Sequence, residues 1–308
     1  MLTEKTLVHS SIKVINFNES KKKMRKLDFL LFLSLAIFYL MLFKANIFVK
    51  SRGVDGKLTM QNTLESAHVV LVNKLSITVI YDNNPYTEGL RAEWGLSCLV
   101  RGSERTILFD TGGKGSSLLA NMHELGINPR EIDTVVLSHI HNDHVGGLIE
   151  FIEKNEQVTV YLPMSFPQEF KDNLMSAGIR IVKVHGATKI CDGVYTTGEL
   201  GAAIKEQSLI VHTTNGMIVI TGCAHPGIVA ILKRAKDLIK DDILLAMGGF
   251  HFGGAGQGDL EKIVLSFRTL GVQFVGPCHC SGDLARQMFE EEYGDSYMHL
   301  GVGRVIEF

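Results

Sequence analysis

The chain has 308 residues, of which 45% are hydrophobic and 21% are charged, a balance typical of a globular protein with a buried core. Its net charge of -2 excludes a globally basic surface, so we predict no nucleic acid as a partner. The five cysteines include no CxxC pair, which argues against a disulfide framework and against a thiolate zinc knuckle.

The N-terminal region differs from the rest of the chain. A basic cluster at residues 21–26 precedes an uninterrupted apolar run at 29–43, which 45–49 extend. We predict a basic segment (1–26), a transmembrane signal-anchor (27–49) and a linker (50–74). A cleaved signal peptide and a buried helix are the alternatives. The basic cluster predicts a single-pass topology with the N-terminus inside and the catalytic domain, residues 75–308, outside the membrane.

From Leu75 onwards, strand patterns and helix patterns alternate along the chain. Residues 95–113 read as a hairpin, and 208–222 as a second hairpin with an Asn-Gly turn. Further strands are expected at 75–84, 132–139, 158–163, 180–184, 243–249, 272–279 and 303–308. Helices are expected at 115–127, 144–155, 167–178, 227–240, 260–271 and 282–294. This order predicts an α/β fold of mixed sheets covered by helices: a four-layer αββα sandwich fits, and so does a doubly wound sheet.

The stretch "SHIHNDHVGG", residues 138–147, carries the strongest chemical signal in the sequence. It follows a buried strand and combines three imidazoles with a carboxylate, which are ligands for Zn²⁺, Fe²⁺ or Mn²⁺. His139 and His141 form one subset, and Asp143 and His144 form a second, which suggests two metal ions side by side. A purely structural zinc site would favour thiolates and would need no aspartate.

Further ligands must come from other strand ends. His225, His251 and His279 each follow a predicted strand in a glycine-containing loop, as the first cluster does. Asp110, in "ILFDTGG", also ends a strand, and a carboxylate there could hold the second ring nitrogen of a ligand histidine.

The motifs "FDTGG", "SHIHNDHVGG", "TGCAHPG" and "PCHCSG" together resemble the metallo-β-lactamase-fold superfamily over residues 75–308. The resemblance implies an αββα sandwich with two divalent metal ions, usually zinc, at one sheet edge. Most dinuclear members carry a bridging aspartate in the stretch where this chain has Cys223, so the resemblance does not assign the bridging ligand here. The motif set also looks like a subgroup labelled with a dihydropteroate-synthase-like activity of methanopterin biosynthesis.

By this resemblance, one metal ion is held by His139, His141 and His225, and the other by Asp143, His144 and His279. The pair would activate a bridging water, with Asp143 orienting it and His251 acting as an extra acid or phosphate-binding group. The remaining expected contributors would hold the metal ligands in place or contact the substrate: Asp110, Cys223, Asn83, Asn84, Glu93 and Trp94. Cys223 is either a ligand or packs under the site, and Trp94 could stack on a planar ring.

Three functions follow from these residues. The first is a metal-dependent hydrolase acting on a phosphorylated small molecule, in particular a phosphoester. The second is a pterin-type transferase that releases diphosphate, as the subgroup label implies. The third is a non-catalytic, membrane-tethered metal-binding module. The ligand set alone cannot separate hydrolysis from transfer, because both chemistries use the same arrangement of cations.

Overall fold

The computed structural model describes residues 71–308. The predicted basic segment, the transmembrane anchor and most of the predicted linker lie outside these residues. Within residues 71–308, no helix combines the length and the apolar composition needed to cross a bilayer. Val72, in the last part of the predicted linker, is buried and forms a bridge with Thr213.

Seven strands form the first sheet: β1 (Ser76–Tyr81), β2 (Ser97–Arg101), β3 (Ile107–Phe109), β4 (Thr134–Val136), β5 (Thr159–Pro163), β6 (Arg180–Val184) and β13 (Val305–Glu307). Their order is β13-β1-β2-β3-β4-β5-β6. The pairs from β13 to β3 are antiparallel, and those from β3 to β6 are parallel. The predicted hairpin at 95–113 is thus confirmed as the antiparallel pair β2–β3.

Six strands form the second sheet: β7 (Thr188–Cys191), β8 (Val194–Thr196), β9 (Leu209–Thr213), β10 (Gly216–Thr221), β11 (Ile243–Gly249) and β12 (Phe274–Cys278). Their order is β12-β11-β10-β9-β8-β7, with parallel pairing from β12 to β10 and antiparallel pairing from β10 to β7. The predicted Asn-Gly hairpin is confirmed as β9–β10. The predicted mixed sheets are therefore confirmed, and two separate sheets replace the doubly wound alternative.

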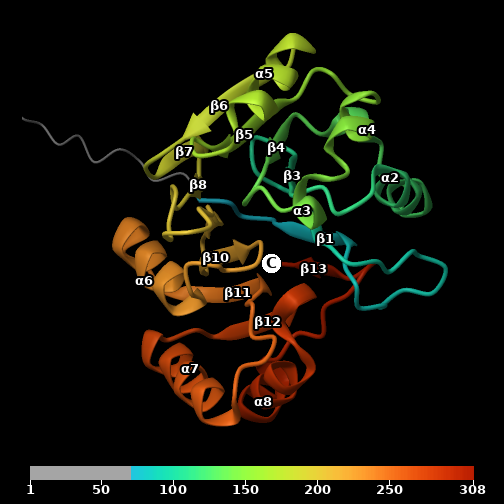
Figure 1. Cartoon of the computed structure of the whole chain (residues 1–308). Coiled ribbons are helices and arrows are strands. Elements are labelled where there is room, and N and C mark those ends of the chain that lie inside the picture. Colours follow the sequence, from blue (N-terminus) through green and yellow to red (C-terminus); the bar gives the residue numbers. More distant parts are fainter. Residues whose placement is uncertain (1–70) are drawn as a thin grey trace, which may run out of the picture. The chain divides into compact units, whose positions relative to one another are not determined.

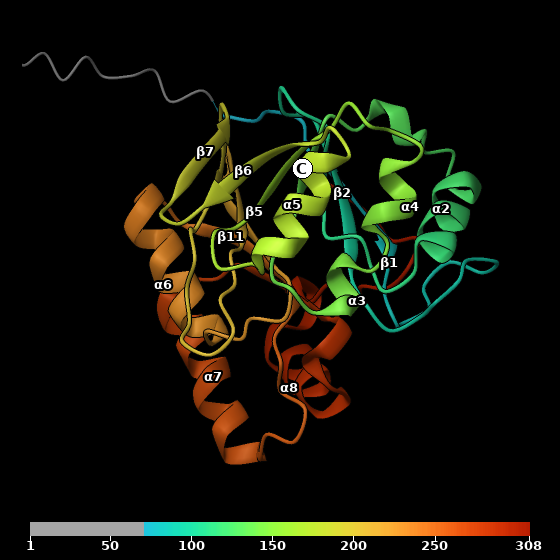
Figure 2. The same cartoon turned by 45° about the horizontal axis from the view of Figure 1, so that its top comes forward.

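Helices cover the outer face of each sheet (Figures 1 and 2). Beside the first sheet lie α2 (Gly115–Glu124), α3 (Asn142–Val145), α4 (Leu148–Ile152) and α5 (Gln168–Ser176). Beside the second lie α6 (Ile228–Ile239), α7 (Gln257–Leu270) and α8 (Asp283–Tyr293). Short 3₁₀ turns occur at Pro129–Glu131, His279–Ser281 and Gly294–Ser296. The spacing of apolar residues explains this packing: α6 buries Ile228, Ile231, Leu232 and Ala235 along one face.

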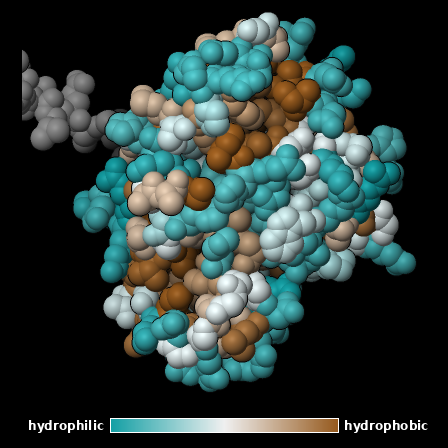
Figure 3. Space-filling view, viewed as in Figure 1, coloured by the Kyte–Doolittle hydropathy of each residue, from teal (hydrophilic) through white to brown (hydrophobic). Residues whose placement is uncertain are grey.

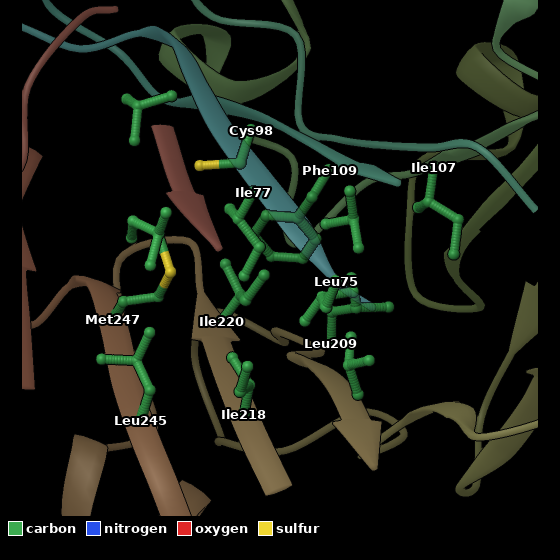
Figure 4. Close-up of a cluster of buried hydrophobic side chains, with 14 of the residues drawn as sticks. Leu75, Ile77, Cys98, Ile107, Phe109, Leu209, Ile218, Ile220, Leu245 and Met247 are labelled. Carbon is green, nitrogen blue, oxygen red and sulfur yellow. The ribbon is translucent and has the colours of Figure 1, made fainter. Parts of the chain in front are cut away.

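Three buried clusters define the layers. One lies between the sheets and joins first-sheet residues such as Ile77 and Phe109 to second-sheet residues such as Ile220 and Met247 (Figure 4). A second joins the first sheet to α2, α4 and α5, and a third joins the second sheet to α6, α7 and α8. The described residues therefore form helix, sheet, sheet and helix layers, which is the predicted sandwich order.

One local prediction needs correction, and one hairpin lies outside the predicted elements. The helix expected at 144–155 is split into α3 and α4 around Gly146 and Gly147. A Cβ atom at Gly147 would lie only 2.2 Å from the Thr111 carbonyl oxygen, so only glycine allows the chain to pass that loop so closely. The β7–β8 hairpin had not been predicted, although its turn contains the hairpin-favouring dipeptide Asp192-Gly193.

Candidate metal centre

The predicted ligands come together from the carboxyl ends of strands in both sheets. The histidine-rich stretch follows β4, and Asp110 follows its neighbour β3. In the second sheet, Cys223 and His225 follow β10, His251 follows β11, and His279 follows β12. Because β10, β11 and β12 are parallel, their carboxyl ends share one sheet edge, where ligand sites are commonly built.

His139, His141 and His225 form the first group of donors. Their ligand atoms all lie within 4.8 Å of one another. His141 Nδ1 is 3.1 Å from His139 Nε2 and 3.2 Å from His225 Nε2. The three rings meet edge-on, with centroids 4.7 to 4.8 Å apart. Three imidazole nitrogens converging on one point match the protein ligands of an open zinc site.

Asp143, His144, Cys223 and His279 form the second group. Asp143 Oδ2 lies 3.6 Å from His144 Nε2 and 3.3 Å from His279 Nε2, and Cys223 Sγ lies 3.2 Å from His144 Nε2. Within residues 71–308, His279 Nε2 is a buried polar atom without a hydrogen-bond partner. Because a buried polar atom without a partner is costly, this nitrogen fits a bound cation.

Cys223 lies where the two groups meet. It belongs to the second group and also to a set with His225 and His251, whose ring centroids are 4.4 Å apart. The sequence left open whether this thiol is a ligand or packs beneath the site. Its sulfur lies within 4.8 Å of the other candidate donor atoms of both sets, which fits the role of a ligand. His251 is exposed at the rim.

A buried carboxylate and a serine orient the ligands of the first sheet. Asp110 is completely buried, and its Oδ2 lies 2.7 Å from His144 Nδ1. It also accepts hydrogen bonds from the backbone N–H and the hydroxyl of Ser138, both at 2.7 Å. Ser138 Oγ in turn lies 2.9 Å from His139 Nδ1. A proton held on Nδ1 of each ring leaves Nε2 free to bind a metal, which is the role predicted for Asp110.

Asn83 and Asp82 support His279. Asn83 Oδ1 lies 2.9 Å from His279 Nδ1, and its amide donates to the His279 carbonyl oxygen at 3.2 Å. Asp82, which is fully buried and had not been singled out, accepts from the His279 backbone N–H. Asn84 is turned toward Asp82 and Arg286, which bind its side chain.

Glu206 is a further residue that sequence reasoning missed. It is only 1% exposed. Its Oε1 accepts from the backbone N–H groups of Gly222, Cys223 and Ala224, and its Oε2 accepts from that of His225. The carboxylate therefore fixes the loop that carries two donors, and no local pattern around Glu206 signals this role.

The environment favours the neutral form of His139, His144 and His225, as metal binding requires. Burial, followed by the charges of neighbouring histidines, lowers the pKa values of His139 and His144. The same causes lower the pKa of His225 to about 4. Burial raises the pKa of Asp110 to about 8, against the hydrogen bonds from Ser138.

Backbone strain gathers around these residues. Asp110, Ala224, His251 and His279 all have φ values between 48° and 57°, a region that costs free energy for residues with a side chain. Each stands next to a donor or is one itself. Such strain is common at functional sites, where the surrounding structure holds it in place.

Comparisons with known proteins identify the family of the chain. Residues 95–255 match the family model of the metallo-beta-lactamase superfamily. Over 280 residues, the chain is 28% identical to the 7,8-dihydropterin-6-methyl-4-(beta-D-ribofuranosyl)-aminobenzene-5'-phosphate synthase of Methanocaldococcus jannaschii, covering 75% of this chain and 95% of that protein. The likeness to this subgroup is thereby confirmed.

Solved structures show the same fold. A metal-dependent hydrolase of the beta-lactamase superfamily is 29% identical, with a TM-score of 0.65 over 76% of this chain and 99% of that one. The metallo-beta-lactamase fold protein YhfI from Bacillus subtilis is 13% identical, with a TM-score of 0.58 over 77% and 100%. The chain described here belongs to the metallo-beta-lactamase superfamily.

Proposed function

We propose that this protein is a metal-dependent hydrolase that acts on a phosphoester of a small molecule. The observation that carries the proposal is the convergence of two donor groups, with Cys223 between them, at one edge of the sandwich. A pair of divalent ions, preferably Zn²⁺ with Fe²⁺ or Mn²⁺ as alternatives, would supply an activated water and neutralise charge on phosphate oxygens.

Residues of the chain would bind the ions, position the ring protons, orient the water and protonate the leaving group. His139, His141 and His225 would hold one ion, and Asp143, His144, Cys223 and His279 the other. Asp110 and Ser138 would keep the Nδ1 protons of His144 and His139 in place. Asp143, whose side chain is 20% exposed, can accept a hydrogen bond from a water at the site and orient it. The exposed His251 can donate a proton to the departing alcohol oxygen.

A phosphodiesterase assay tests this proposal. The full-length chain should hydrolyse bis-p-nitrophenyl phosphate when loaded with zinc or manganese, lose turnover on chelation, and regain it when metal is restored. His139→Ala should be inactive, whereas His123→Ala, a change of an exposed histidine on α2, should keep full activity. Turnover that survives both chelation and His139→Ala would rule the proposal out.

The relative from Methanocaldococcus jannaschii favours a second candidate function. Its name describes a synthase of a ribofuranosylaminobenzene phosphate compound, so a pterin-type transfer that releases diphosphate is the alternative. An exposed tryptophan beside the site, Trp94, suits a substrate with a planar ring. Diphosphate release that requires both the pterin diphosphate and the aminobenzene phosphate would establish transfer, and diphosphate release from the pterin diphosphate alone would indicate hydrolysis.

We further propose that residues 27–49 tether the enzyme to a membrane with residues 75–308 outside. The apolar run preceded by lysines supports this topology. Added protease should then digest the catalytic domain in intact cells without permeabilisation. Complete protection of the domain would contradict it.

A further inference from the structure

A pocket of about 450 Å³ opens directly beside the second donor group. Its volume lies within the usual range for small-ligand sites. The pocket includes one candidate metal ligand, Asp143, so a molecule bound in it would touch the reacting centre. Its lining residues are Tyr81, Glu93, Trp94, Gly113, Lys114, Asn142 and Asp143.

Trp94 provides the largest flat surface in this pocket. Its side chain is 59% exposed, and its ring centroid lies 4.9 Å from that of His279 at an interplanar angle of 54°. One edge of the indole is therefore held near a candidate metal ligand while much of the ring remains free. On the face shown in Figure 3, hydrophobic surface is broken into separate patches by hydrophilic residues. An exposed tryptophan within a pocket therefore indicates a ligand contact more strongly than the scattered apolar surface outside the pocket does.

Glu93 provides a fixed, partly exposed carboxylate next to Trp94. Tyr81 donates its hydroxyl to Glu93 Oε2 at 3.1 Å, Lys114 Nζ lies 3.1 Å from the same oxygen, and Ser117 donates to Oε1 at 3.0 Å. Burial raises the pKa of Tyr81 to about 12, so the phenol stays protonated and keeps donating. A carboxylate offers about four acceptor positions, which leaves acceptor capacity on Oε1 for a ligand.

We propose that this pocket binds a planar, amino-substituted nitrogen heterocycle as the non-reacting part of the substrate. The ring would stack on Trp94 and donate an N–H to Glu93, which places an attached phosphate toward Asp143 and the donor groups. The polar lining argues against a long aliphatic chain, which would leave Glu93, Lys114 and Asn142 facing hydrocarbon. This inference rests on the proposed function, because the ring is assigned to the substrate of that site.

The single tryptophan of the chain makes the test specific. Guanosine 5'-monophosphate has a ring with amino and N–H donors, so adding it to the full-length, metal-loaded protein should quench the Trp94 fluorescence in a saturable way. Ribose 5-phosphate carries the same sugar phosphate without a ring, and we expect no saturable quenching from it. Equal effects of the two compounds would overturn the inference.

Variants separate the ring contact from a general loss of structure. Trp94→Ala should weaken guanosine 5'-monophosphate binding, measured by calorimetry, by roughly ten- to a hundredfold, because stacking on an aromatic side chain is lost. Trp94→Phe should restore part of the affinity. Glu93→Gln keeps the fluorescent reporter and should weaken binding about tenfold. Tyr86→Ala removes an exposed aromatic residue that contacts Arg304 outside this pocket, and it should leave affinity unchanged.

The two proposals can fail separately. Turnover of bis-p-nitrophenyl phosphate without ring-dependent quenching would overturn the pocket assignment and leave the hydrolase proposal intact. Saturable, Trp94-dependent binding without any metal-dependent turnover would support the pocket and count against the hydrolase. Binding that Trp94→Ala does not weaken would overturn the pocket assignment whatever the turnover.

Discussion

Two buried carboxylates support the two halves of the candidate site, and they do so differently. Asp110, in the first sheet, contacts the side chain of His144 and reaches His139 through Ser138. The carboxylate of Glu206, in the loop before β9, accepts hydrogen bonds only from backbone N–H groups of the loop from Gly222 to His225. The first carboxylate therefore sets the proton position on ligand rings, whereas the second sets the path of the chain that carries ligands. Substituting each should thus change different properties of the protein.

The largest effect should come from Asp110→Asn. Asparagine tolerates the positive φ of 57° at this position, so the backbone should be kept. Its amide N–H₂ would face His144 Nδ1 and favour the tautomer with the proton on Nε2, where the metal must bind. We expect metal affinity to fall by roughly 10- to 100-fold, measured by competition with a chelating dye.

A matched control distinguishes this effect from a general loss of stability. Asp133→Asn changes a half-exposed aspartate that accepts a backbone hydrogen bond from Thr106 far from the donor groups. It should leave metal affinity unchanged. If both variants bind metal as tightly as the original chain, Asp110 does not control the tautomer of His144.

A smaller and more local effect is expected for Glu206→Gln. One oxygen of the new amide can still accept hydrogen bonds, but the N–H₂ group replaces an acceptor, so a backbone N–H loses its partner. This should lower the free energy of unfolding by about 1–3 kcal/mol. Because the disturbed loop carries His225, metal affinity should fall about tenfold. Urea unfolding and dye competition measure the two quantities.

Glu199→Gln is the control for Glu206→Gln. Its side chain is also mostly buried and accepts a backbone hydrogen bond, from Ser165, but it has no contact with the ligand loop. The substitution should lower the free energy of unfolding as well, but metal affinity should not change. An equal loss of metal affinity in both variants would show that general destabilisation, and not the ligand loop, is responsible.

The smallest effect concerns pH. Burial raises the pKa of Glu206 from 4.5 to about 7. Between these values the folded protein retains a proton that the unfolded chain has released, so this group makes the free energy of unfolding fall as pH rises. His139, His144 and His225 have lowered pKa values, so they make the free energy of unfolding rise with pH and oppose the contribution of Glu206. The test therefore compares the metal-free original chain with Glu206→Gln by urea unfolding at about pH 5 and about pH 7.5. On going to the higher pH, the free energy of unfolding of the original chain should fall relative to that of Glu206→Gln, and an equal pH dependence in both would contradict the assignment.

The contrast between Asp110 and Glu206 also explains which parts of the site the sequence could predict. The motif from Ser138 to Gly147 is contiguous and follows a buried strand. The sequence therefore predicts both its metal-binding donors and their position at the end of a strand. The strand-then-glycine context also identified His225 and His279, because parallel strands bring their carboxyl ends together. The matching motif at Asp110 indicated its supporting role in advance.

Glu206 and Asp82 could not be predicted in this way. Asp82 lies near the end of the predicted strand 75–84, and Glu206 lies between predicted elements. Each becomes a buried support only through contacts with residues distant in sequence. The split between α3 and α4 was missed because the apolar spacing continues across Gly146 and Gly147, whereas close packing on Thr111 breaks the helix.

The central claim is that donors from both sheets hold a pair of cations. Elemental analysis of the full-length chain, purified without added metal and dialysed, tests it most directly. We predict about two divalent ions per chain, falling to about one in His225→Ala and in His279→Ala, because each change removes a donor from a different group. A folded protein that binds no metal, or a metal content that neither substitution changes, would contradict the account and favour a non-catalytic module.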